Sequence, residues 1–252
     1  MIIAVIGKGG AGKTTVAALL LRRLLEGGER PVLAIDADPS SCLGSALGIG
    51  VERTLAQLRD EMREGRADRP SSMSSGEYLS LRGEEALVER EGFDLLTMGH
   101  PEGKGCYCFV NNLIREHLDR LGRAYRHVLL DCEAGLEHLS RRTAGRPDLL
   151  LCVCGRPRSS AETIRRALEI YRSLDGQLPP RVDLVLNGFA EGEPEAFQAH
   201  SRARCDGMRF DRLLLIPHDP AVAELERAGR SLFELDGSSP AHRALEPWSI
   251  GP

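Results

Sequence analysis

Near its amino terminus the chain reads Gly7-Lys8-Gly9-Gly10-Ala11-Gly12-Lys13-Thr14-Thr15. This segment satisfies the pattern G-x-x-x-x-G-K-[ST], which cradles phosphate groups when a strand precedes it and a helix follows it. The apolar run at residues 1–6 predicts the strand, and residues 14–26 predict the helix, because their apolar side chains recur on one side. The sequence therefore predicts a phosphate-binding loop between the first strand and the first helix.

The residue types in this loop explain how it can hold a nucleotide. Glycines let the backbone turn so that successive N–H groups converge on phosphate oxygens, and the helix N-terminus adds the positive end of its dipole. Lys13 can reach the β- and γ-phosphates, and the Thr14 hydroxyl can ligate Mg²⁺. We expect ATP or ADP, with Mg²⁺, as the ligands. The loop residues assigned to the nucleotide are Gly9, Gly10, Ala11, Gly12, Lys13, Thr14 and Thr15.

Short apolar runs alternate with amphipathic helical stretches along the rest of the chain, which is typical of an α/β fold. Continuous apolar strands indicate a mostly parallel, twisted sheet with helices on both faces. Residues 51–90 are instead rich in Arg, Glu, Ser and Gly, so we predict an insertion of short surface helices and loops within a single domain spanning residues 1–252. Further strands are predicted at residues 31–36, 93–98, 127–131, 149–154, 182–187 and 213–216, and further helices at 110–121 and 161–174.

The charge balance limits the partners that the chain can be expected to have. Its 252 residues carry 37 acidic and 33 basic side chains, which gives a formal net charge of −4. That balance gives no electrostatic reason to expect a nucleic acid or an anionic membrane as a partner. No apolar run approaches the ~20 residues that a membrane span needs, and the first residues read as a strand rather than a signal peptide. We therefore expect a cytoplasmic protein.

Acidic residues follow two of the predicted strands. Asp38 lies just beyond residues 31–36, and Asp131 ends the strand at residues 127–131. The carboxyl ends of parallel strands beside a phosphate-binding loop are where Mg²⁺ or its water shell needs a carboxylate. We therefore assign both acids to the nucleotide site.

The seven cysteines include two C-x-C pairs in different surroundings. Cys152 and Cys154 lie in a continuous apolar strand, which favours their burial as small apolar side chains. Cys106 and Cys108 lie in a loop rich in Gly and Pro, where two thiolates can bind one soft or borderline metal ion. Two ligands fill about half of a four-coordinate shell, so the same pair from a second copy across a two-fold axis would complete it.

The form K-G-G-x-G-K-T-T at residues 8–15 resembles the deviant Walker A ATPases, the class of the nitrogenase iron protein and of the bacterial partitioning and septum-positioning ATPases. The resemblance implies a dimer in which Lys8 reaches the nucleotide of the other subunit. It places Asp38 in switch I, where the residue positions the attacking water, and makes Asp131 the Walker B acid. It also matches Gly135 to the switch II glycine that senses the γ-phosphate.

Three further residues match this class. Asn187 ends a predicted strand as the adenine-contacting asparagine of the class does, and Pro217 lies in a segment that resembles the loop bordering the base. Glu133 is expected, with Asp131 and Gly135, to carry the γ-phosphate state to the cysteine loop, as switches do. The residues to which the resemblance gives catalytic roles are Lys8, Lys13, Asp38 and Asp131.

The run Gly105-Cys106-Tyr107-Cys108 and the run D-C-E-A-G-L-E-H-L-S at residues 131–140, together with the phosphate-binding loop, resemble the CooC family. These ATPases assist nickel insertion into carbon monoxide dehydrogenase. The resemblance implies that Cys106 and Cys108 bind Ni²⁺ or Zn²⁺ at the interface of a homodimer. It implies carbon monoxide dehydrogenase or a related nickel enzyme as the client, with ATP closing the dimer around four thiolates and hydrolysis reopening it.

Two other functions remain open at this stage. An electron-transfer ATPase could hold a [4Fe–4S] cluster across the dimer, although Cys132 follows Asp131 too closely to match the second cluster cysteine of the nitrogenase iron protein. A positioning or partitioning ATPase would use ATP-driven dimers on DNA or membrane. The net charge and the C-x-C loop argue against that reading.

Overall fold

The computed structural model describes residues 1–65, 69–100, 124–132, 147–155, 158–176, 178–190 and 208–250. Within these ranges the chain forms one eight-stranded sheet in the order β3-β4-β2-β5-β1-β6-β7-β8. All neighbouring strands are parallel except β3 and β4. The predicted α/β fold is confirmed. The strands are β1 Ile2–Gly7, β2 Val32–Ala37, β3 Leu87–Arg90, β4 Phe93–Thr97, β5 His127–Cys132, β6 Leu149–Cys154, β7 Arg181–Phe189 and β8 Arg212–Pro217.

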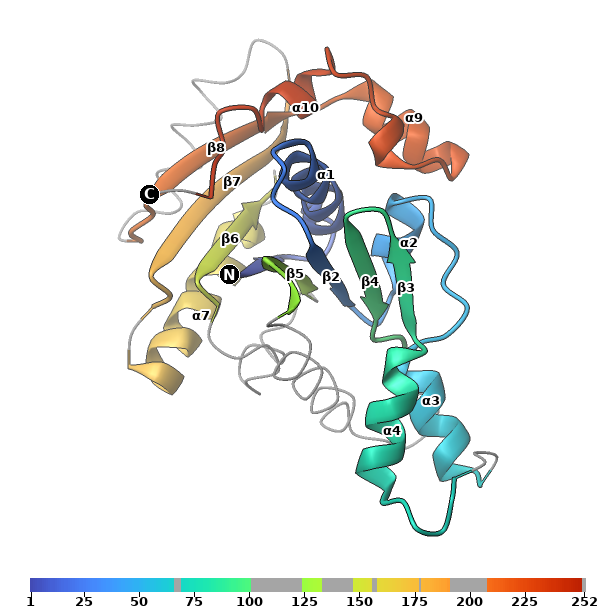
Figure 1. The fold of residues 1–252 in the computed structure, drawn as a ribbon. Helices are drawn as coiled ribbons and strands as arrows, with labels where there is room; N and C mark the ends of the chain where they lie inside the picture. The colour runs from blue at the N-terminus through green and yellow to red at the C-terminus, as the bar shows by residue number, and fades with distance from the viewer. Residues whose placement is uncertain are drawn as a thin grey trace.

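Helices cover both faces of this sheet, and the alternation of side chains along β1 shows how (Figure 1). Ile3 and Val5 pack into the apolar cluster that contains α1, whereas Ala4 and Ile6 pack into the cluster that contains α7. Successive strand side chains point to opposite faces, so one strand contributes to two cores. The helices are α1 Lys13–Glu26, α2 Cys42–Ala46, α3 Leu55–Arg63, α4 Ser75–Glu84, α7 Arg158–Asp175, α9 Pro220–Ala228 and α10 Pro240–Arg243, with a 3₁₀ turn η2 Leu232–Glu234.

The insertion at residues 51–90 contains the expected short helices, but also a strand that the sequence analysis missed. Helices α3 and α4 form a hairpin that projects beyond the ends of β3 and β4 (Figure 1). Each begins with a capping box, Thr54 with Gln57 and Ser74 with Glu77, which satisfies amide groups that have no partner inside the helix. Strand β3 pairs antiparallel with β4 and is exposed toward its end, so its sequence lacks the apolar run of the central strands.

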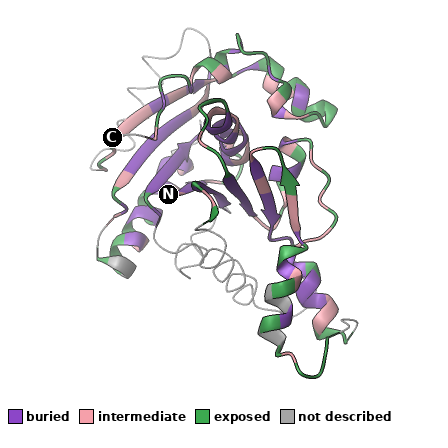
Figure 2. Cartoon of the chain, viewed as in Figure 1, coloured by how far each residue is buried: buried purple, intermediate pink, exposed green. Residues whose placement is uncertain are grey.

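The central strands are almost entirely buried, and exposure increases toward the α3–α4 hairpin and α9 (Figure 2). Cys152 and Cys154 are 0% and 1% exposed, which confirms their prediction as core residues. Within the described residues, no helix is both long and apolar enough to cross a membrane. The helix predicted at residues 110–121 lies outside the described residues.

Candidate nucleotide site

The phosphate-binding loop joins the carboxyl end of β1 to α1, as predicted, and its glycines are needed for close approach. A Cβ on Gly7 would lie 2.4 Å from the carbonyl oxygen of Val153 in β6. Gly12 has a φ of 87°, and a Cβ there would lie 2.1 Å from Nδ2 of Asn187. The loop is therefore packed against two neighbouring strands, and side chains at these positions would push them apart.

Asn187 and Pro217 come together beside this loop. Asn187 Nδ2 donates a hydrogen bond to the carbonyl oxygen of Ala11 at 2.9 Å. Both residues border a cavity of about 230 Å³ that also takes in Thr15 and residues of α9. Thr15 Oγ1 donates to Oε1 of Glu226 in α9 at 2.7 Å. This cavity lies where the sequence analysis places the adenine base.

Asp131 is the last residue but one of β5 and contacts the first turn of α1. Its Oδ2 accepts a hydrogen bond from Thr14 Oγ1 at 2.6 Å, and the side chain is 0% exposed. Its Oδ1 has no hydrogen-bond partner among the described residues. Burial raises the pKa of Asp131 to about 6, against the opposing effects of the Thr14 hydrogen bond and the Lys13 charge. A buried carboxylate oxygen without a partner, next to a threonine hydroxyl, fits an oxygen-coordinated cation such as Mg²⁺ or its water shell.

A second buried acid, Asp36, lies level with Asp131. The two residues face each other across the parallel pair β2–β5. Burial, reinforced by the neighbouring Asp131 charge, raises the pKa of Asp36 to about 7. No sequence motif identifies Asp36 as a site residue, because its position beside Asp131 depends on this strand pairing.

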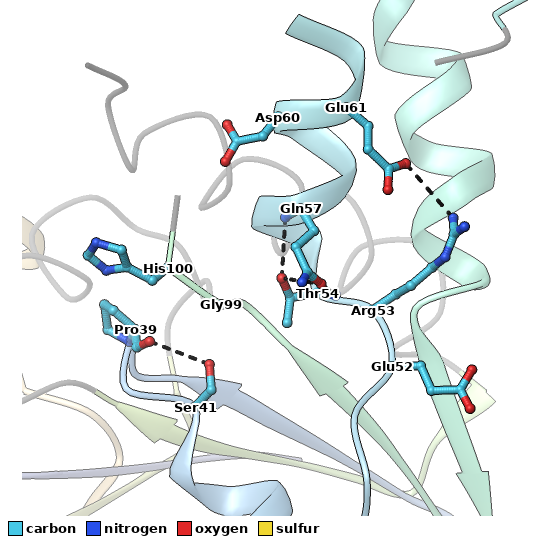
Figure 3. A pocket seen from close by; sticks show the side chains of 10 residues that line it. All are labelled: Pro39, Ser41, Glu52, Arg53, Thr54, Gln57, Asp60, Glu61, Gly99 and His100. Carbon is cyan, nitrogen blue, oxygen red and sulfur yellow. Dashed lines mark hydrogen bonds and ion pairs between the residues drawn. The ribbon is translucent and has the colours of Figure 1, made fainter. Parts of the chain in front are cut away.

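Asp38 follows β2 and is turned toward its own loop. Its Oδ1 accepts a hydrogen bond from the amide of Ser40 at 2.9 Å. The loop borders a polar cavity of about 590 Å³, whose opposite wall is formed by α3 and whose lining includes Gly99 and His100 (Figure 3). Asp38 therefore lies near the nucleotide site, but one of its carboxylate oxygens is bound by an amide of its own loop.

Lys8 is held by its own chain. Its Nζ donates a hydrogen bond at 2.5 Å to Oγ of Ser159, which lies in the first turn of α7. The sequence pattern alone could not reveal this partner, because 151 positions separate the two residues. An intersubunit role for Lys8 requires that this hydrogen bond be exchanged for a contact outside the subunit.

Other predicted site residues lie outside the described residues. These are Cys106, Cys108, Glu133 and Gly135. Within the described ranges no group of three or more His, Cys, Asp or Glu side chains is arranged to hold a metal ion. Cys132 is buried, and burial raises the pKa of its thiol to about 12, so it is poorly suited to bind a metal as thiolate.

Two acids that line the cavity of about 230 Å³, Glu226 and Asp219, have no role in the sequence-based expectations. Glu226 holds Thr15, and Asp219 joins α9 to α10 by accepting hydrogen bonds from the amides of Ala221 and Ala241 at 3.0 and 3.2 Å. A local signal for Asp219 existed, since Asp followed by Pro is a typical helix start. No local signal identifies Glu226.

Comparison with known proteins agrees with this geometry. Residues 2–232 match the family model described as the CobQ/CobB/MinD/ParA nucleotide binding domain. The chain belongs to this family of nucleotide-binding proteins. Over 96% of its length it is 35% identical to the carbon monoxide dehydrogenase accessory protein CooC of Rhodospirillum rubrum, covering 92% of that protein. The resemblance to CooC-type ATPases is thereby confirmed.

Two further relatives show how broad the family is. The uncharacterized ATP-binding protein MJ0685 of Methanocaldococcus jannaschii is 34% identical over 98% of this chain and 96% of its own length. The septum site-determining protein MinD of Pyrococcus horikoshii, solved with Mg-ADP, has a TM-score of 0.65 and 24% identity, with 96% of this chain and 91% of that chain covered. The likeness to MinD establishes the fold. Membership of the family establishes that the chain is an ATPase.

Proposed function

We propose that this ATPase is a homodimeric metallochaperone that carries nickel for carbon monoxide dehydrogenase or a related nickel enzyme. The observation that carries the proposal is the near full-length similarity to CooC in a chain that has the C-x-C pair Cys106 and Cys108. Neither fact alone suffices, because the family includes proteins with other tasks and a lone thiol pair is an incomplete metal site. Together they favour a nucleotide-driven metal carrier.

The stoichiometry of the proposed metal site follows from coordination chemistry. A cysteine pair offers two thiolates, whereas a closed tetrahedral site needs four ligands. Two copies of Cys106 and Cys108 on a two-fold axis supply four sulfur ligands without any other residue. Nickel or zinc is then the cargo of the dimer, and thiolate ligands alone do not select between them.

The nucleotide chemistry is assigned to residues of each subunit. Amides of the phosphate-binding loop and the buried Lys13 hold the phosphates of ATP. Thr14 and Asp131 would hold Mg²⁺ and its water shell, and the ion would neutralise charge on the phosphates. Asp38 positions the attacking water once its carboxylate leaves the Ser40 amide.

Dimer closure is assigned to Lys8. In the described state Ser159 binds its ammonium group, and we propose that the nucleotide of the second subunit replaces Ser159 when ATP is bound. Closure brings the four thiolates together, and hydrolysis separates them again. Because the two sites are linked, nickel must change the affinity for nucleotide by the same factor as nucleotide changes the affinity for nickel.

Metal stoichiometry measured on anaerobically purified protein tests the proposal. Ni²⁺ and Zn²⁺ are titrated without nucleotide, with ADP and with a non-hydrolysable ATP analogue. We expect one ion per dimer, an affinity that depends on the nucleotide, and loss of binding in Cys106→Ser/Cys108→Ser. Cys42→Ser is the matched control, because Cys42 is an exposed free thiol elsewhere in the chain.

Binding that survives the double substitution would refute the metal site. A visible absorption band from an iron–sulfur cluster would instead favour the electron-transfer function. The positioning function rests on the fold shared with MinD, and salt-dependent DNA binding or vesicle binding that requires ATP would favour it. Neither behaviour is expected from a chain with a net charge of −4.

A further inference from the structure

Asp36 occupies an unusual position for a charged residue. It lies inside the central strand β2 and is 0% exposed. Its Oδ1 accepts a hydrogen bond from the amide of Asp38 at 3.2 Å, and its Oδ2 accepts one from the amide of Leu43 at 2.8 Å. One buried side chain therefore binds both ends of the segment 38–43, which we call the switch loop.

The switch loop needs such a restraint, because its backbone is strained. Ser41 has a φ of 52° in the left-handed region, which residues other than glycine rarely adopt. Such conformations persist where the surrounding structure fixes them. The amide of Ser41 donates to the carbonyl oxygen of Asp38 at 2.9 Å, so the strained turn lies between the two bonds made by Asp36.

The chemistry of the two donors explains why the residue is an aspartate. Leu43 is in the first turn of α2, where backbone N–H groups have no acceptor within the helix. The Asp38 amide lies just past the end of β2. A carboxylate offers an acceptor oxygen to each, whereas the amide of an asparagine would offer one acceptor and direct a donor at the other N–H.

The other side of the switch loop faces a cavity. Pro39 and Ser41 line the cavity of about 590 Å³ that separates the loop from Thr54 and Gln57 of the α3 N-terminus, as Figure 3 shows. Within the described part of the chain, displacement of the loop toward α3 therefore meets this cavity rather than packed side chains. The two bonds to Asp36 hold the loop on its buried side.

We infer that Asp36 is a positioning residue for ATP hydrolysis: by holding the Asp38 and Leu43 amides it fixes the switch loop and so sets where the Asp38 carboxylate lies. The inference depends on the role proposed above for Asp38. It does not depend on the metal site. In this assignment Asp36 acts through the switch loop and not by contact with the nucleotide.

The first test compares Asp36→Asn with Asp183→Asn. Asp183 is also 0% exposed in a strand, but it pairs with Arg181 in β7, on the far side of β1 and β6. We expect Asp36→Asn to lower kcat for ATP by roughly tenfold to a hundredfold, because a small misplacement of a catalytic group has that effect. The Kd for ATP should stay unchanged, and Asp183→Asn should change neither.

A second readout reports the loop directly. Cys42 lies next to Leu43 and has an exposed thiol, so its alkylation rate, followed by peptide mass spectrometry, measures how firmly the loop is held. Asp36→Asn should raise this rate several-fold, and Asp183→Asn should leave it unchanged. An unchanged Cys42 rate, or a kcat within twofold of wild type, would overturn the inference.

A measurement on the wild-type chain covers the case in which Asp36→Asn does not fold. The Leu43 amide should exchange slowly with solvent deuterium, because Asp36 is its acceptor and a first-turn amide otherwise has none. Fast exchange at Leu43 contradicts the inference. If Asp38→Ala hydrolyses ATP normally while Leu43 is protected, the role proposed for Asp38 fails and the holding role of Asp36 stands.

Discussion

Replacing Gly12 by alanine tests how the phosphate-binding loop is packed. Gly12 precedes α1 with a φ of 87°, and a Cβ at this position would lie 2.1 Å from Nδ2 of Asn187. The Asn187 side chain has to move, which breaks its hydrogen bond to the carbonyl oxygen of Ala11. Gly12→Ala should therefore destabilise the fold in two separable ways. The alanine backbone is strained at this φ, and the Asn187 hydrogen bond is lost.

The matched control is Gly10→Ala in the same loop. Gly10 has a φ of 75°, and a Cβ there would meet nothing within 4 Å. We expect Gly10→Ala to cost the left-handed penalty alone, about 1–2 kcal/mol in the free energy of unfolding. Gly12→Ala should cost about 1 kcal/mol more, the typical contribution of the lost Asn187 hydrogen bond.

Urea unfolding of the nucleotide-free protein measures both costs. In an Asn187→Ala background the additional cost of Gly12→Ala should disappear, since the obstructing side chain is absent, and the two glycine substitutions should become equivalent. Binding of a fluorescent ADP analogue should weaken more for Gly12→Ala than for Gly10→Ala, because Asn187 borders the cavity in which we expect the adenine base to bind. An equal cost of Gly12→Ala in both backgrounds would refute the packing described here.

Three further predictions concern the charged groups of the site. Thr14→Val should abolish the Mg²⁺ dependence of nucleotide affinity, measured by titration with and without Mg²⁺, because it removes the hydroxyl that contacts Asp131. Burial raises the folded-state pKa of Asp131 from 3.8 to about 6. The folded state therefore binds more protons, so stability without Mg²⁺ should fall as pH rises from about 4 through 6, by at most about 3 kcal/mol. Asp131→Asn should make this part of the pH profile of thermal unfolding less steep, and the slope that remains should come from Asp36, whose pKa is also raised. Ser159→Ala should release Lys8 and increase dimer formation with an ATP analogue in analytical ultracentrifugation, whereas Lys8→Ala should abolish it.

The sequence predicted the phosphate-binding loop and the main strands because both are encoded locally. A loop between β1 and α1 needs glycines at fixed positions, and buried strands need continuous apolar runs, so each leaves a readable pattern. The edge strand β3 was missed for the same reason, since its half-exposed Leu87–Arg90 lacks such a run. Polar strands at a sheet edge resemble loops in composition.

The contacts that tune the site could not be predicted, because they depend on which strands become neighbours. Chain order does not reveal that β2 lies beside β5, and that pairing is what brings Asp36 level with Asp131. Likewise Lys8 meets Ser159, and Thr15 meets Glu226, across more than a hundred positions each. The residue types in these pairs are common throughout proteins, so only their positions in the folded chain show that they interact.

The same strand order joins the nucleotide site to the start of the cysteine segment. Strand β2 also pairs with β4, and the amide of Met98 donates to the carbonyl oxygen of Asp36 at 2.8 Å. The residue that holds the switch loop through its side chain thus holds the end of β4 through its backbone. Beyond β4 the sequence continues through Gly99 and His100, which line the cavity beside the switch loop, toward Cys106 and Cys108. A nucleotide-dependent movement of the switch loop would therefore act at the point from which the proposed metal-binding segment begins. In the proposed function, this is where ATP hydrolysis would be linked to metal binding.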